Sequence, residues 1–88
     1  MNFNEYIDLY EKTHKLNGLR LYARCSGINL EHKKILIHVL RDKLRLSFSQ
    51  IGRLFKNEHG TVFWHYNSAK MDAEFEKKVE DAWKLYRP

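Results

Sequence analysis

The chain has 88 residues, a formal net charge of +5, 31% charged residues and 43% apolar residues. This size suits one small folded domain, and this balance is that of a globular protein rather than a disordered one. No apolar run approaches the ~20 residues that cross a bilayer, and we expect neither a membrane span nor a signal peptide. Cys25 is the only cysteine, so no disulfide can form within the chain and we expect a protein of the reducing cytoplasm.

Basic charge is concentrated in the centre of the chain. Residues 15–56 hold ten basic and two acidic residues, a net charge of +8, whereas both flanking segments are slightly acidic. A basic centre of this kind is typical of a surface that faces nucleic-acid phosphates. It is equally compatible with a solvated surface that is simply rich in lysine, so charge alone leaves both possibilities open.

The spacing of apolar residues predicts an all-α protein of five to six helices with no strand. We expect an N-terminal helix over about 3–15 that Asn2 or Asn4 caps, a short helix over about 19–25, and a C-terminal helix over about 72–86 that begins at Asp72. The longest periodic stretch, about 30–44, predicts a central helix with a broad apolar face. Its basic residues are expected to point away from that face, namely Lys33, Lys34, Arg41 and Lys43. We treat residues 1–88 as one domain.

Residues 47–70 predict two short helices joined by a tight polar connection. Ser47 and Gln50 have the spacing of a capping box, ahead of a first helix over about 48–55. A second helix is expected from His59, with an inward stripe made up of Val62, Tyr66 and Ala69. Gly52 falls where a close approach between the two helices leaves no room for a side chain. Such a pair is typical of the helix-turn-helix, which places its second helix in the major groove of DNA.

Within this stretch, Ile51-Gly52-Arg53-Leu54-Phe55 and then Glu58-His59-Gly60-Thr61-Val62 resemble the C-terminal DNA-binding domain of the replication initiator DnaA. The likeness covers about residues 15–88 and implies a six-helix, Trp-repressor-like fold that binds double-stranded DNA without enzyme chemistry. It includes no nucleotide-binding domain, so no ATP-driven step is implied. Two positions depart from the family pattern: Trp64 stands where the family usually has histidine, and Gly60 stands where it more often has threonine, serine or alanine.

The resemblance also implies a set of DNA contacts. The start of the second helix would enter the major groove with Glu58, His59, Gly60 and Thr61. The first helix would meet the DNA backbone or a thymine methyl through Ser47, Phe48 and Ser49, and Arg24 and Arg20 would lie near a neighbouring minor groove. Phosphate contacts are expected from the basic residues Arg20, Arg24, Lys33, Lys34, Lys43 and Arg45. Trp64 and His65, on the outward face of the second helix, complete the set.

Several alternatives stay open. Glu58 either caps the second helix or accepts a hydrogen bond from a cytosine amine. Trp64 either contacts DNA or packs into the core or against a partner protein, and Trp64 or Trp83 could seal a homodimer. A different class of function is a protein-interaction module that binds and modulates a replication initiator or another replication protein. Binding to RNA or single-stranded DNA through stacked aromatic residues is a third possibility.

We expect no enzyme activity, cofactor or metal ion. His32 and His38 are six residues apart, as are His59 and His65, and this spacing does not place two ligands on one face of a helix. The sequence contains no recognisable nucleophile motif, phosphate-binding glycine loop or pair of acidic residues for acid–base catalysis. The protein is therefore expected to be a DNA-binding accessory or regulator, of the kind that phages and other mobile elements encode.

Overall fold

The computed structural model describes residues 1–16 and 27–87, and this part of the chain contains helices and no strand. Its elements are α1 (Phe3–Thr13), α2 (Ile28–His38), the π-helical segment η1 (Val39–Lys43), α3 (Phe48–Phe55), α4 (His59–Ser68) and α5 (Ala73–Trp83). The expected all-α class is confirmed. The short helix expected over about 19–25 lies outside the described residues, and so do Arg20 and Arg24.

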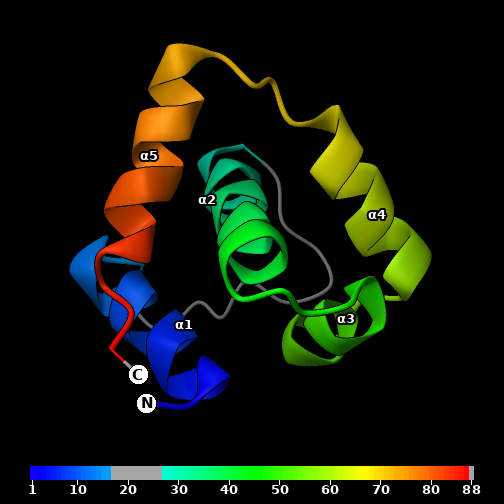
Figure 1. Cartoon of the computed structure of the whole chain (residues 1–88), viewed down its shortest axis with the longest axis horizontal. Coiled ribbons are helices and arrows are strands. Elements are labelled where there is room, and N and C mark those ends of the chain that lie inside the picture. The colour runs from blue at the N-terminus through cyan, green and yellow to red at the C-terminus, as the bar shows by residue number, and fades with distance from the viewer. Residues whose placement is uncertain (17–26, 88) are drawn as a thin grey trace.

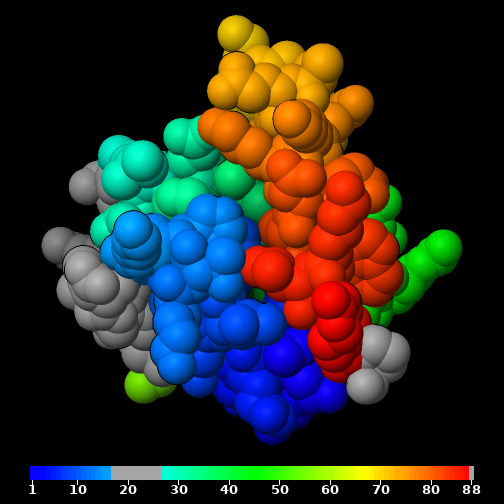
Figure 2. Space-filling view, turned by 90° about the vertical axis from the view of Figure 1, so that its left-hand side faces the viewer, coloured from blue at the N-terminus to red at the C-terminus, as the bar shows by residue number. Residues whose placement is uncertain are grey.

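The other helices surround α2, which lies at the centre of the molecule (Figure 1). In this view α4 and α5 flank α2 on opposite sides, and α1 and α3 lie toward one end of it. Figure 2 shows α1 and α5 side by side on one face. The two chain ends meet there, since the Met1 ammonium donates a hydrogen bond to the Arg87 carbonyl at 3.0 Å. The surfaces of α4 and α5 are thus separated by the central helix.

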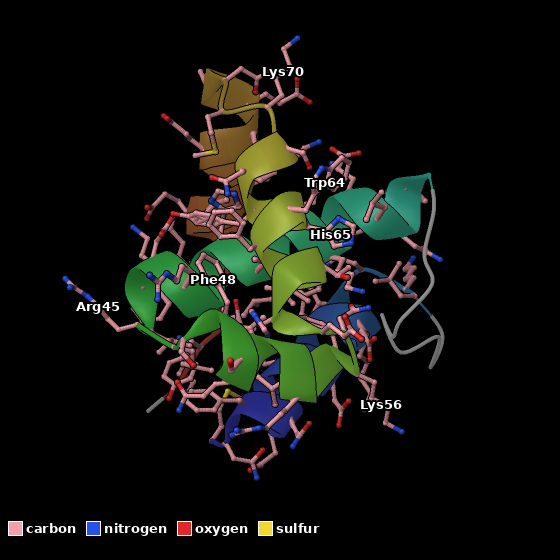
Figure 3. The ribbon with its side chains drawn as sticks, turned by 90° about the vertical axis from the view of Figure 1, so that its right-hand side faces the viewer. Arg45, Phe48, Lys56, Trp64, His65 and Lys70 are labelled. Carbon is pink, nitrogen blue, oxygen red and sulfur yellow. The ribbon has the colours of Figure 1, made fainter. Side chains whose placement is uncertain are left out.

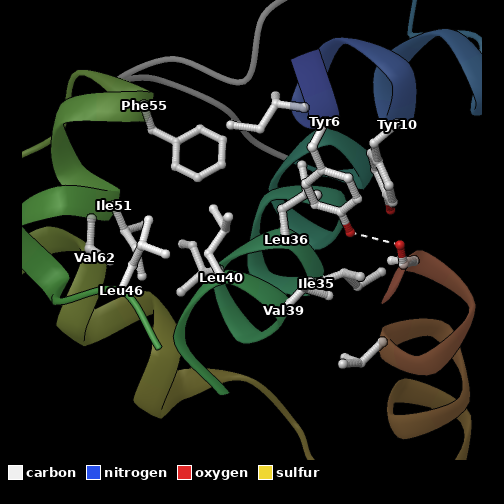
Figure 4. Close-up of a cluster of buried hydrophobic side chains, with 14 of the residues drawn as sticks. Tyr6, Tyr10, Ile35, Leu36, Val39, Leu40, Leu46, Ile51, Phe55 and Val62 are labelled. Atoms are coloured by element: carbon white, nitrogen blue, oxygen red, sulfur yellow. Dashed lines mark hydrogen bonds between the residues drawn. The ribbon is translucent and has the colours of Figure 1, made fainter. Parts of the chain in front are cut away.

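The core is a cluster of buried side chains to which every one of these helices contributes (Figure 4). Its fully buried members include Tyr6, Ile7, Leu36, Leu40, Ile51, Phe55 and Val62. Within the core, α1 and α5 are joined by the Tyr6 hydroxyl, which donates to the Ala82 carbonyl at 2.7 Å. A hydrogen bond of this kind contributes about 0.5–1.5 kcal/mol to stability, so it helps to fix how the two helices pack.

The predicted helix starts are confirmed by their caps. The side chain of Asn2 accepts a hydrogen bond from the third residue of α1 at 2.8 Å, and that of Asp72 accepts one from the third residue of α5 at 2.8 Å. The helix ends differ from the prediction. α1 ends at Thr13, where the chain turns through Lys15 with a φ of 56°, and α5 ends at Trp83.

The central helix is not the uniform α-helix expected over about 30–44. It begins at Ile28, and its last five residues, Val39–Lys43, are π-helical. The Leu44 amide donates to the carbonyl five residues earlier at 3.1 Å. A π-helical turn is wider than an α-helical turn and often occurs at functional sites. Here the segment carries Asp42, which receives a hydrogen bond from the Tyr66 hydroxyl of α4.

Candidate nucleic-acid interface

α3 and α4 are joined by Lys56, Asn57 and Glu58, in a connection that passes very close to Gly52. Lys56 has a φ of 56°, in the left-handed region, and the Asn57 amide donates to the Gly52 carbonyl at 2.9 Å. A Cβ added at Gly52 would lie 2.5 Å from the Asn57 carbonyl oxygen, closer than real Cβ atoms come. Gly52 therefore lies at a close approach, but its neighbour is the connection and not α4, the helix that the prediction placed there.

The start of α3 matches its prediction. The Gln50 amide donates to the Ser47 hydroxyl at 3.1 Å, and the Ser47 amide donates to the Gln50 side-chain carbonyl at 2.8 Å. Ser47 and Ser49 are exposed. Phe48 is half-buried, and the Arg41 guanidinium lies 4.5 Å from the centre of its ring. The two serines are therefore accessible from outside, whereas Phe48 is partly used in packing.

α4 begins without a side-chain cap. Glu58 occupies the N-cap position, but its side chain accepts no cap hydrogen bond; its backbone carbonyl accepts from the amides of Thr61 and Val62. The capping role considered for the Glu58 side chain is therefore wrong. Its carboxylate is exposed, as are His59, Gly60 and Thr61. The first turn of α4 is open to solvent on its outer side.

The outward face of α4 is exposed and uncharged. The ten residues of the helix include no Lys, Arg, Asp or Glu. At 3.6 residues per turn, Gly60, Trp64 and Asn67 point about 140–160° away from the buried Val62. Trp64 is 63% exposed and its neighbour Phe63 is 53% exposed. Packing of Trp64 into the core, one of the alternatives, is therefore wrong.

Basic side chains lie around this face. Figure 3 looks onto α4 and shows Arg45, Lys56 and Lys70 directed outward around it, and all three are exposed. Lys34 of α2 is close as well, with its ammonium 6.0 Å from the centre of the Trp64 ring. Residues 44–70 hold four basic residues and one acidic residue. The surface formed by α3, α4 and their flanking links therefore carries net positive charge.

Lys33 is buried, so the prediction that it points to solvent and contacts phosphate is wrong. Its side chain is 0% exposed and lies against the connection between α3 and α4. There the ammonium donates to the side-chain carbonyl of Asn57 and lies 5.6 Å from the centre of the Phe55 ring. A buried ammonium requires polar partners, and this one finds Asn57. Lys33 supports the connection from α2 and does not reach the surface.

Two other predicted contacts are placed differently from the prediction. Lys43 forms an ion pair with Glu80 of α5 at 2.5 Å, so it lies at the junction of η1 with α5. His65 is half-buried, and its Nδ1 atom is buried without a hydrogen-bond partner among the described residues. Burial lowers the pKa of His65, and Lys33 and Lys34 lower it further. The imidazole is therefore neutral near pH 7 and turned partly away from the outward face.

The second half of α4 is held by a cluster that the sequence did not reveal. The buried His38 ring stacks on Tyr66 with 4.2 Å between ring centres, and its Nε2 donates to the Tyr66 carbonyl at 3.1 Å. The Tyr66 hydroxyl donates to Asp42 at 2.5 Å, and this bond raises the pKa of Tyr66. An open hollow of about 420 Å³ beside the cluster is lined by Arg41, Asp42, Arg45 and Tyr66. α2 and η1 thus hold the end of α4 in place beside a basic hollow.

Comparisons with protein-family models, curated proteins and solved structures find no match for this chain. Within residues 1–16 and 27–87, no helix is long and apolar enough to cross a membrane. The same residues contain no group of three or more His, Cys, Asp or Glu side chains that could hold a metal ion.

The structure gathers part of the predicted set on one surface and adds to it. Of the predicted residues, the exposed members there are Arg45, Ser47, Ser49, Glu58, His59, Gly60, Thr61 and Trp64. Three exposed basic residues that were not predicted join them: Arg53, Lys56 and Lys70. The signal in the sequence that could have identified these three residues is their position within or at the end of the predicted helix pair.

Proposed function

We propose that this protein binds double-stranded DNA, with α3 and α4 acting as a helix-turn-helix and α4 lying in the major groove. The observation that carries the proposal is the exposed, uncharged outward face of α4 with basic side chains around it. Phosphates are bound by cations, whereas base edges are read by side chains that form hydrogen bonds or apolar contacts. Ten residues of helix span about 15 Å, a length that suits the major groove.

The proposed contacts form two groups. Arg45, Lys56 and Lys70 bind phosphates on either side of the groove. His59 and Thr61, at the open first turn of α4, reach base edges through the imidazole nitrogens and the hydroxyl. Affinity then comes mainly from the first group and sequence preference from the second.

The resemblance to the DnaA C-terminal domain points to the same arrangement. The tight connection at Gly52 and the exposed residues 58–61 at the start of α4 are the features of this structure that support it. The proposal extends to an accessory or regulator that binds DNA and includes no catalytic step.

The test is fluorescence anisotropy with a labelled mixed-sequence duplex over a series of salt concentrations. We expect binding at low salt, with the logarithm of the affinity falling by about 0.9 per phosphate contact for each tenfold rise in salt. Arg45→Ala and Lys70→Ala should each reduce this slope by about one. Lys77→Ala removes the same charge from α5, on the opposite side of α2, and should leave the slope unchanged.

Two results would contradict the proposal. The first is an absence of duplex binding at low salt. The second is an equal effect of Arg45→Ala, Lys70→Ala and Lys77→Ala, which would mean that the protein binds DNA through its overall charge and not through the surface around α4.

A second candidate function is favoured by one observation, the exposure of both Phe63 and Trp64. Adjacent exposed aromatic residues are typical of surfaces that bind other proteins. A protein-interaction module that binds a replication protein would use this pair, and its duplex affinity would not respond selectively to Arg45→Ala. The salt titration therefore separates the two candidates.

A further inference from the structure

Trp64 stands at the centre of the outward face of α4. It points about 160° away from the buried Val62, and Gly60, one turn earlier, adds no side chain beside it. A Cβ built at Gly60 meets no atom within 4 Å, so the flank of the Trp64 ring is open on that side. The indole is therefore the largest group that any molecule approaching this face would meet.

Two polar side chains near the end of α4, Asn67 and Ser68, donate hydrogen bonds back to the helix. The Asn67 amide donates to the Phe63 carbonyl at 3.1 Å, and the Ser68 hydroxyl donates to the His65 carbonyl at 3.3 Å. Donors that are used in this way do not reach a base edge. What α4 offers to a partner beyond its first turn is mainly the apolar surface of Phe63 and Trp64, together with the indole N–H of Trp64.

We infer that Trp64, with Phe63 beside it, reads thymine by packing on the 5-methyl group in the major groove. This inference rests on the proposed function. The thymine methyl is the apolar group that projects into the major groove, where the other base-edge groups are hydrogen-bond donors and acceptors. The carbon surface of an indole is therefore stabilised by contact with the thymine methyl, a group that the other three bases lack.

Two neighbours hold this aromatic pair in place. The Phe63 ring forms a T-shaped pair with Phe48 of α3, with 5.3 Å between ring centres, and the Lys34 ammonium lies 6.0 Å from the centre of the Trp64 ring. Because large rings with few rotatable bonds lose little entropy on binding, the pair is suited to a defined contact. Each methyl group that it covers should raise affinity about fourfold, the value of burying one carbon of this size.

The experiment compares duplexes that differ only in this methyl group. A short alternating dA·dT duplex is titrated against the same duplex in which deoxyuridine replaces every thymidine. A second comparison adds the methyl group instead of removing it: an alternating dG·dC duplex is titrated with and without 5-methylation of cytosine. We expect the wild-type protein to bind the thymidine duplex at least fourfold more tightly than the deoxyuridine duplex, and to bind the methylated dG·dC duplex more tightly than the unmethylated one.

Two variants test whether Trp64 is responsible for the preference for methyl groups. Trp64→Ala should still bind duplex DNA but lose the preference for methyl groups. Met71→Ala also removes an exposed apolar side chain, 51% exposed and outside α4, and should keep the preference. Circular dichroism confirms that both variants are folded. Equal wild-type affinity for the thymidine and deoxyuridine duplexes would overturn the inference and leave the proposed function standing, whereas no binding to any duplex would overturn both.

Discussion

Replacing Gly52 with alanine adds one methyl group at the tightest point between α3 and the connection to α4. The new Cβ would lie 2.5 Å from the Asn57 carbonyl oxygen, well inside contact distance, so the backbone at one of the two positions must move. The connection resists this movement in two ways. The Asn57 amide is bonded to the Gly52 carbonyl at 2.9 Å, and the Asn57 side chain is held by the buried Lys33.

The size of the effect follows from two opposing terms. Overpacking at a site that cannot relax costs about 1–3 kcal/mol, and alanine returns up to about 1 kcal/mol because it is a better helix former than glycine. We therefore expect Gly52→Ala to lower the free energy of unfolding by about 1–2 kcal/mol. For a domain of this size that corresponds to a fall of roughly 5–15 °C in melting temperature.

Thermal unfolding followed by circular dichroism measures the change in melting temperature that Gly52→Ala causes. Gly60→Ala is the matched control. Gly60 is also in a helix, but a Cβ there meets nothing within 4 Å, so only the gain in helix propensity remains. Gly60→Ala should leave the melting temperature unchanged or raise it slightly. If Gly52→Ala melts at or above the wild-type temperature, the tight contact between α3 and the connection is refuted.

Three further predictions concern the packing around the site. Tyr6→Phe should destabilise the fold by about 0.5–1.5 kcal/mol in chemical denaturation, because the 2.7 Å bond to the Ala82 carbonyl is lost while the Leu85 amide still donates to that carbonyl. Lys33→Met should alter stability yet leave the salt slope of duplex binding at the wild-type value, unlike Arg45→Ala, because Lys33 contacts no phosphate. Burial first, and then the nearby lysines, lower the pKa of His65 in the folded state, so the unfolded chain takes up the proton more readily. The stability that folding gains from the neutral His65 ring is therefore complete above the pKa of histidine in the unfolded chain, about 6.5, and is lost as pH falls below that value. Between about pH 7.5 and pH 5, the melting temperature of His65→Gln should therefore fall less than that of the wild type.

Local signals in the sequence predicted most of the helix starts. The capping residues Asn2, Ser47 and Asp72 each start a helix where expected, and α3 has the predicted bounds. These features depend on neighbouring residues, so the sequence contains what is needed to find them. Gly52 was identified for the same reason, since a glycine inside a helical pattern costs stability unless a close contact needs it.

Features that depend on contacts between distant residues were missed. Lys33 lies on one stripe of α2 with Leu30 and Ile37, which was a sign of burial, but the residue that receives its hydrogen bond is Asn57, 24 positions later. The π-helical turn of η1 has no recognisable signal in the sequence. The basic residues around α4 come from links on both sides of α3 and α4, so their common surface appears only in the fold.

The most direct test of the central claim is an amide chemical-shift titration of the protein by NMR with a duplex DNA. If α4 is the helix that enters the groove, the largest shifts should fall in residues 59–68 of α4 and at the start of α3, residues 47–50. The amides of α5, on the opposite side of α2, should remain nearly unchanged. Shifts centred on α1 or α5, with α4 unaffected, would contradict the proposal that α4 faces the DNA.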